Sequence, residues 1–190
     1  MESGTWTSLE VAQLAVAVLT PVLLLLLGLL VARRTKNLDL AHWLNQQLIE
    51  RRLEVHDDMA PKLNDLYCLF RCRGHFRDID PPAAIARKRA LDKKFHVNRA
   101  LFTTEFQGAY HSFMDACFLM DAALGEDAKL KLDGEWLKDE RGEDLTWGSE
   151  WDDRFAADEA LEPEEFDRRY DALVAGFARE FGVIEGSARS

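Results

Sequence analysis

The chain has 190 residues, a formal net charge of −10 and three cysteines. The residues from position 37 onward are enough for one modest domain. The negative charge argues against nucleic acid as a partner, and no interleaving of aromatic and basic residues marks a surface for stacking bases. Cysteines that are few and odd in number exclude an extracellular disulfide framework.

The first predicted element is a membrane-spanning helix. Residues 11–32 contain no charged side chain, and about 20 apolar residues suffice to cross a bilayer. A cleaved signal peptide needs a basic start and a shorter apolar core of about 7–15 residues, whereas Glu2 and Glu10 precede this run. A helix in the core of a soluble domain is rarely apolar on all its faces for so long. We therefore expect a permanent anchor.

The flanking charges predict the orientation of this anchor. Arg33, Arg34 and Lys36 follow the run directly, and no lysine or arginine precedes it. Basic flanks remain in the cytoplasm. We therefore expect residues 1–10 outside the inner membrane and the large C-terminal part in the cytoplasm.

After the anchor, apolar residues recur at helical spacing. One stripe runs from Leu40 to Phe70, and within it we expect Pro61 to kink the helix or to start a new one. A second helix is expected over about residues 83–97. A third is expected from Phe102 to Leu124, with Gly125 as its stop.

The part that follows is acidic and less regular. "KLKLDGEW" alternates apolar and polar residues around Asp133, which fits a small hairpin or a loop. Ser149 and Asp152 form an S-x-x-D signal for a short helix. The last helix is expected to begin near Pro163 and to end at Gly182.

The simplest architecture is all-α, with a transmembrane helix followed by an antiparallel helical bundle. The expected parts are an extracytoplasmic N-terminus (1–10), the transmembrane helix (11–32), the first three bundle helices (33–125), the acidic tryptophan-containing segment (126–160), the final bundle helix (161–182) and a disordered tail (183–190).

Basic residues gather in the second predicted helix, at Arg87, Lys88, Arg89, Lys93 and Lys94. Three interpretations remain open. The cluster lies on the anionic inner leaflet, binds an anionic ligand such as a nucleotide, or faces the acidic segment of the same chain or of another copy. The sequence favours the last, because both charges are present in one chain.

Three tryptophans gather in the acidic segment, at Trp136, Trp147 and Trp151. Tryptophan often anchors protein–protein interfaces. The other interpretation is that these rings fold onto the bundle and hold an otherwise loose segment, and the sequence favours it.

Nothing in the sequence indicates an enzyme, a cofactor or a metal site. The histidines are scattered, without the spacing of a zinc motif. The best catalytic candidates are the cluster of His56, Asp57 and Asp58 and the pair of His111 and Asp115. A structural role is the simpler interpretation for each of them. Cys68 and Cys72 are four apart and are expected to be inert.

Three phrases carry a resemblance: "APKLNDLYCLF" (60–70), "KRALDKKF" (88–95) and "WGSEWDDRF" (147–155). They resemble a group of small bacterial proteins with one N-terminal span and a cytoplasmic helical domain, some of which look like components of anti-phage defence loci. The resemblance covers about residues 38–160 and implies a setting but no catalytic residues.

The function that follows is an interaction or effector module held at the inner membrane. Its expected partners are the lipid bilayer, a cytoplasmic protein and, as a further possibility, other copies of the chain. The alternative is a membrane-tethered sensor whose basic cluster binds a nucleotide-like anion.

Overall fold

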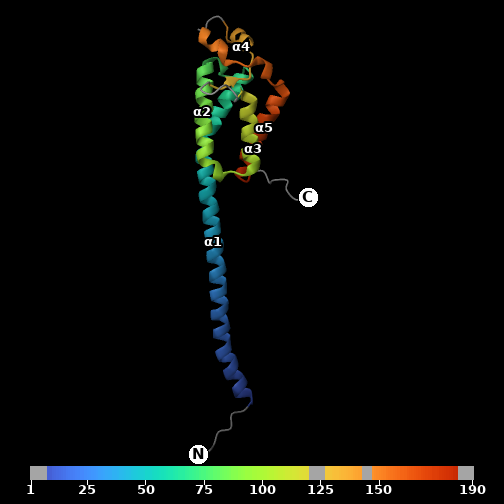
Figure 1. The fold of residues 1–190 in the computed structure, drawn as a ribbon. Coiled ribbons are helices and arrows are strands. Elements are labelled where there is room, and N and C mark those ends of the chain that lie inside the picture. Colours follow the sequence, from blue (N-terminus) through green and yellow to red (C-terminus); the bar gives the residue numbers. More distant parts are fainter. Residues whose placement is uncertain (1–7, 120–126, 143–146, 184–190) are drawn as a thin grey trace, which may run out of the picture. The chain divides into compact units, whose positions relative to one another are not determined.

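The computed structural model describes residues 8–119, 127–142 and 147–183 (Figure 1). The side chains at positions 8–12, 14–16, 18, 34 and 36–41 also lie outside the description. The chain divides into two compact units, Met1–Gln47 and Leu48–Ser190. The predicted tail from position 184 onward and the first seven residues lie outside the described residues.

Helix α1 runs from Ser8 to Phe70. In the first unit its described large apolar side chains between positions 19 and 31 are 47–67% exposed. Over the residues that the structure describes, no helix is both long enough and apolar enough to cross a membrane. Positions 11, 12, 14–16 and 18 of the predicted anchor belong to the undescribed side chains.

No new helix begins at Pro61, because α1 continues through it. The side chains of Met59, Leu63 and Leu66 are at most 2% exposed on either side of the proline. A proline inside a helix removes one backbone hydrogen bond. The packing of apolar side chains on both sides of Pro61 compensates for the lost hydrogen bond. This packing cannot be seen in the sequence pattern, which is why the sequence alone also allowed a new helix there.

Helix α1 ends in a tight turn, where Cys72 has a φ of 44° and Gly74 a φ of 58°. A short 3-10 helix, η1 (Phe76–Asp78), leads to α2, which spans Pro81–Asn98. Asp80 caps α2, because its Oδ1 accepts a hydrogen bond from the Ala83 backbone nitrogen at 2.6 Å. The helix begins slightly before the predicted start at about residue 83, because Pro81 and Pro82 form the first turn of α2, where a missing N–H costs nothing.

A second 3-10 helix, η2 (Arg99–Leu101), separates α2 from α3, which spans Thr104–Cys117. The predicted extension of this helix to Leu124 is wrong. The chain becomes extended at β1 (Phe118–Leu119), which pairs antiparallel with β2 (Lys129–Leu130). The predicted stop at Gly125 lies outside the described residues.

The predicted hairpin around Asp133 is also wrong. Asp133 caps α4 (Gly134–Arg141), and its Oδ1 accepts hydrogen bonds from the backbone nitrogens of Glu135 and Trp136. Aspartate serves equally well in tight turns and at helix N-termini, so the pair Asp133-Gly134 alone does not tell a hairpin turn from a helix start.

The remaining elements are two 3-10 helices, η3 (Ser149–Arg154) and η4 (Ala157–Glu159), and the last helix α5 (Pro163–Glu180). The predicted start of α5 is confirmed, and so is its stop at Gly182, which has a φ of 73°. The Val183 nitrogen donates to the Ala178 carbonyl at 2.9 Å, as in a glycine-terminated helix. The short helix at Ser149 is confirmed, although no side chain caps it.

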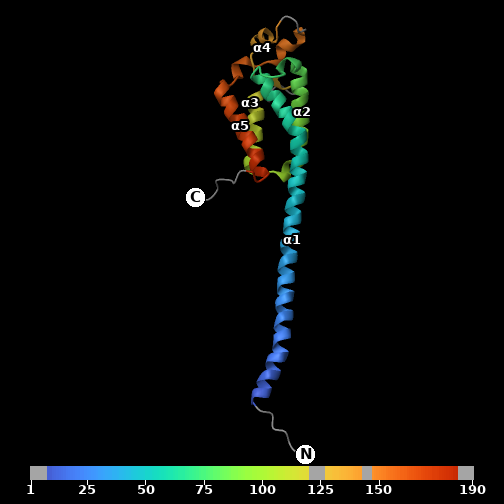
Figure 2. The same ribbon diagram turned by 180° about the vertical axis from the view of Figure 1, so that it is seen from behind.

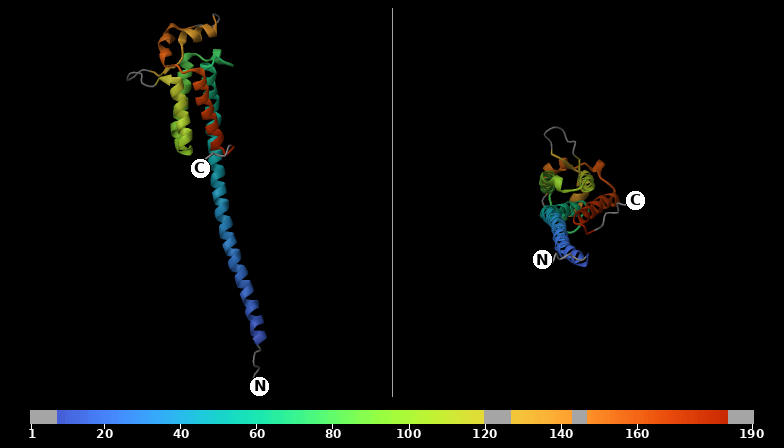
Figure 3. Two further views of the ribbon diagram at one scale, coloured as in Figure 1. Left: turned by 90° about the vertical axis from the view of Figure 1, so that its right-hand side faces the viewer. Right: turned by 90° about the horizontal axis from the view of Figure 1, so that it is seen from below.

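The core of the second unit lies among α2, α3, α5 and the part of α1 from Leu48 onward (Figure 2). Helices α3 and α5 pack side by side (Figure 3). The Phe106 ring lies 4.5 Å from the Phe177 ring, measured between centroids, and the Phe95 and Tyr110 rings stack at 3.9 Å. The second unit is therefore a helical bundle with one short strand pair, which confirms the all-α class in its coarse form.

Candidate functional site

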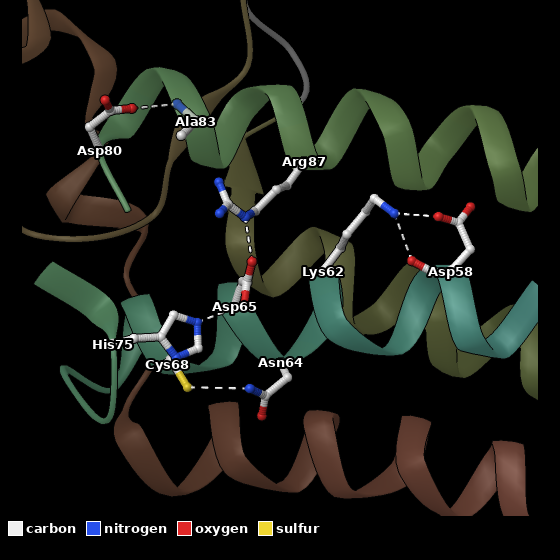
Figure 4. A network of polar contacts seen from close by, with 9 residues as sticks. All are labelled: Asp58, Lys62, Asn64, Asp65, Cys68, His75, Asp80, Ala83 and Arg87. Atoms are coloured by element: carbon white, nitrogen blue, oxygen red, sulfur yellow. Dashed lines mark hydrogen bonds and ion pairs between the residues drawn. The ribbon is translucent and has the colours of Figure 1, made fainter. Parts of the chain in front are cut away.

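Two members of the predicted basic cluster join α2 to α1. The Arg87 Nε donates to the Asp65 Oδ2 at 2.6 Å (Figure 4), and the Lys94 Nζ lies 3.2 Å from the Asp58 Oδ2. Both carboxylates belong to the part of α1 that lies in the second unit, so the two ion pairs connect neighbouring helices of one unit.

The other three members differ in their surroundings. Lys88 is only 7% exposed, and its Nζ donates to the Asp92 Oδ2 at 2.7 Å. Arg89 pairs with Asp127 of the acidic segment. Lys93 is exposed and has no ion pair with any described residue. Four of the five charges therefore have a carboxylate partner within the chain, but only the partner of Arg89 belongs to the acidic segment named in the third interpretation.

Asp65 receives two donors at once (Figure 4). Its Oδ1 lies 2.7 Å from the His75 Nε2, while its Oδ2 accepts from Arg87. Burial alone raises the pKa of this carboxyl, but the hydrogen bonds from Arg87 and His75 outweigh it and leave the pKa below its ordinary value. Asp65 is thus a charged anchor point that holds α1, α2 and the turn after α1 together.

Trp147 and Trp151 attach the η3 segment to α4. The two rings meet edge to face at 5.4 Å, and the Trp147 Nε1 donates to the Asp152 Oδ1 at 2.8 Å. Lys138 and Arg141 of α4 lie over these rings at 5.9 Å each, in cation–π geometry. This arrangement agrees with rings that fold onto the bundle.

Trp136 has a different environment. Its side chain is 40% exposed, and it borders a hollow of about 320 Å³ beside Phe70 and Phe166. Of the three predicted interface tryptophans, this is the one that presents a large apolar surface to solvent.

A larger apolar groove runs between α1 and α5 and has a volume of about 430 Å³. We call it the α1–α5 groove. Its floor is core, since Leu63 and Leu173 are at most 2% exposed, and its rims are open, since Leu53 is 41% and Val174 49% exposed. The lining residues are Leu53, His56, Asp57, Ala60, Leu63, Tyr170, Leu173, Val174, Phe177, Ala178, Phe181 and Val183.

Besides Tyr170, the polar side chains that line the α1–α5 groove are His56 and Asp57, which are neighbours on α1. The His56 ring meets Phe177 and Phe181 edge to face at 4.8 and 5.2 Å, and its Nδ1 lies 3.4 Å from the Asp57 Oδ1. The Asp57 side chain is 79% exposed, and its carboxylate pairs with no lysine or arginine among the described residues. The groove therefore fits an apolar occupant that places a cation beside Asp57.

A buried ion pair joins α1 to the C-terminal end of α5, one of the two helices that form the groove. Arg52 Nη2 lies 2.9 Å from the Glu180 Oε2, and the guanidinium also donates to the carbonyls of Leu101 and Glu180 at 2.6 and 2.8 Å. The Glu180 Oε1 in turn accepts from the Thr103 nitrogen at 2.7 Å. These bonds fix the end of α5 against α1 and the start of α3, so the groove is a preformed feature.

The side chains considered for catalysis do not converge. His56 packs against α5, whereas Asp58 pairs with Lys62 and with Lys94 of α2 on another face of α1. Within the described residues, His111 forms no hydrogen bond with Asp115. No three histidine, cysteine or acidic side chains gather as a metal site in the part of the chain that the structure describes.

The cysteines lie in surroundings that keep them as thiols. Cys117 is fully buried, and burial raises its pKa well above the ordinary value. Burial likewise raises the pKa of Cys68, and it raises the pKa of Cys72 to about 11, assisted by Glu140. Since the thiolate is the reactive species, these are poor nucleophiles at neutral pH.

No sequence pattern marks the α1–α5 groove. Leu53 and Val174 are single apolar residues on two helices, and Val183 follows the end of α5. Only the pairing of α1 with α5 brings Leu53 beside residues that are more than 100 positions away in sequence.

Comparisons with protein-family models, with curated proteins and with solved structures give no match.

Proposed function

We propose that this chain is a membrane-anchored interaction protein. Residues 11–32 insert into a bilayer, and the α1–α5 groove of the second unit binds an amphipathic helix of a cytoplasmic protein. The resemblance noted in the sequence points to a bacterial inner membrane and to a partner in anti-phage defence.

The exposed apolar surface of the first unit carries this proposal. The leucines at positions 23–27 are 51–67% exposed on a helix that has no charged side chain between positions 11 and 32. Burying apolar surface is favourable by about 25 cal/mol per Å². So much exposed leucine on every face of a helix therefore requires a non-aqueous environment, and a bilayer covers all faces at once.

The α1–α5 groove supports the second part of the proposal. Helical partners place apolar side chains at three- and four-residue spacing into such grooves. The net charge of −10 and the exposed Asp57 in the groove lining favour a partner helix with basic residues beside its apolar face.

The anionic-ligand alternative has less support. A ligand at the basic cluster would have to displace the carboxylates of Asp65, Asp58, Asp92 and Asp127. Lys93 alone offers a cation with no ion pair to a described residue, and one exposed lysine makes a weak anion site.

Membrane insertion is tested by alkaline carbonate extraction and flotation of the full-length protein made in bacteria. We expect the protein to stay with the membranes. The double substitution Leu24→Lys and Leu27→Lys should release it, because each central charge costs about 2.5–3.5 kcal/mol on insertion.

The matched control is the double substitution Trp43→Lys and Leu44→Lys. These side chains are 55% and 54% exposed but lie outside the uncharged run. The control should float with the membranes. A wild-type protein found in the soluble fraction would contradict the anchor.

A further inference from the structure

Two histidines that are 15 positions apart in sequence lie together on the surface of the second unit. His96 belongs to the last turn of α2 and His111 to the middle of α3, and their ring centroids are 6.1 Å apart with an interplanar angle of 39°. Both residues are exposed. The sequence gives no hint of this pair, because it arises only from the packing of α2 against α3.

Buried aromatic rings hold the two imidazoles in place. Phe95, which is fully buried, meets the His96 ring at 5.5 Å and the His111 ring at 5.3 Å. Tyr110 meets the His111 ring at 5.7 Å, and its hydroxyl is itself fixed by a 3.0 Å hydrogen bond to Asp92. The rings therefore rest on a rigid apolar floor.

The ring nitrogens of the pair are free to bind a ligand. Neither His96 nor His111 makes a hydrogen bond or an ion pair with any described residue, in contrast to His56 and His75, which lie beside Asp57 and Asp65. Four ring nitrogens on a preformed surface are thus not engaged by the residues that the structure describes.

We propose that His96 and His111 form a two-histidine site for a late first-row divalent metal ion, Zn²⁺ above all. Imidazole suits zinc and copper ions. Two imidazoles that share one tetrahedral ion at a Zn–N distance of about 2.0–2.1 Å have ring centroids about 5.2 Å apart. The observed separation is 6.1 Å, so the two exposed side chains must rotate toward one another to share an ion.

The remaining coordination positions are filled by water, because no third histidine, cysteine or acidic side chain among the described residues gathers with the pair. A bound ion then cross-links α2 to α3, and because it binds the folded chain alone, it stabilises that chain by mass action.

The test uses the purified full-length protein and ZnSO₄. Calorimetric titration should show one Zn²⁺ per chain, and Zn²⁺ at 100 times its dissociation constant should raise the ratio of folded to unfolded protein about 100-fold. His96→Ala and His111→Ala should each weaken binding at least 10-fold, and the double substitution should weaken it little further, because one imidazole alone no longer chelates.

His42→Ala is the matched control, because His42 is also exposed but lies in the first unit. It should leave Zn²⁺ binding unchanged. Cu²⁺ supplies an independent readout, since its electron paramagnetic resonance spectrum should show two equivalent nitrogen ligands that fall to one in either single variant. Zn²⁺ binding that is absent, or that is equal in wild type, His96→Ala and His111→Ala, would overturn the site.

Discussion

Arg52 and Glu180 are 128 positions apart and form the most enclosed ion pair between α1 and α5. Their side chains are 16% and 2% exposed, and the Arg52 Nη2 lies 2.9 Å from the Glu180 Oε2. The Thr103 hydroxyl and backbone nitrogen donate to the other carboxylate oxygen. One carboxylate thus joins the end of α5 to the start of α3 and to Arg52 within α1.

Replacing Glu180 by Ala should strongly destabilise the second unit. Removing one partner of a buried ion pair costs about 3–5 kcal/mol, because the other charge stays buried without compensation. Denaturant unfolding followed by tryptophan fluorescence measures the loss. The control is Glu54→Ala, which breaks the exposed Arg51–Glu54 pair and should change the unfolding free energy by less than about 1 kcal/mol. Equal effects would contradict the role given to Glu180.

Asp65 should make the stability of the second unit decrease at acidic pH. Its folded-state pKa lies below the unfolded value, because the hydrogen bonds from Arg87 and His75 outweigh the opposing effect of burial. The carboxylate therefore contributes stability above the unfolded pKa of about 3.9, and this contribution is lost as the pH falls through the folded pKa. Asp65→Asn should unfold more easily near neutral pH and lose less stability between about pH 5 and pH 3. Parallel pH profiles for wild type and variant would rule this out.

Two glycines should respond to alanine in opposite directions. A Cβ on Gly176 of α5 would lie 3.0 Å from the buried Phe106 ring, whereas a Cβ on Gly108 of α3 would meet nothing within 4 Å. Alanine improves helix propensity by about 1 kcal/mol at either position. Gly108→Ala should therefore stabilise the unit by about 0.5–1 kcal/mol. Gly176→Ala should destabilise it, because α3 and α5 must separate. Thermal unfolding of both variants measures the direction of each stability change. Stabilisation by Gly176→Ala would contradict the prediction, because it would show that the Phe106 ring can move away from the added Cβ.

The native cysteines should react slowly with iodoacetamide at neutral pH. Burial raises the pKa of all three thiols, that of Cys72 to about 11. Intact-mass analysis should show little alkylation of the native protein and three alkylated residues after denaturation. Rapid modification of the folded chain at Cys72 would contradict the environment described for that side chain.

The sequence predicted the helices better than it predicted their junctions. Pro163 and Gly182 mark α5 correctly, because proline at a helix start and glycine after its end act through local backbone geometry. The end of α3 at Cys117 was missed, since it depends on pairing between Phe118 and Leu130 across an intervening segment. Local patterns cannot report such a contact.

The candidate sites also combine features that are visible in the sequence with features that only the structure shows. The basic residues of α2 were visible as a cluster, but their carboxylate partners Asp58 and Asp65 belong to α1 and are found only in three dimensions. The α1–α5 groove and the pair of His96 and His111 likewise combine residues from different helices. Apolar and histidine residues carry no sequence signal of function unless their spacing is fixed within one element.

Photo-cross-linking from the α1–α5 groove, in membranes from cells that make the full-length chain, tests the proposed function most directly. Benzoylphenylalanine is placed at Val174, which is 49% exposed in the groove, and, as the control, at Val97 of α2, which is 76% exposed outside it. We predict one defined protein adduct from position 174 and none from position 97, with the adduct lost when Leu53→Lys is added. An adduct of two copies of this chain would make the occupant a second copy, and the absence of any adduct specific to position 174 would contradict the groove as a binding site.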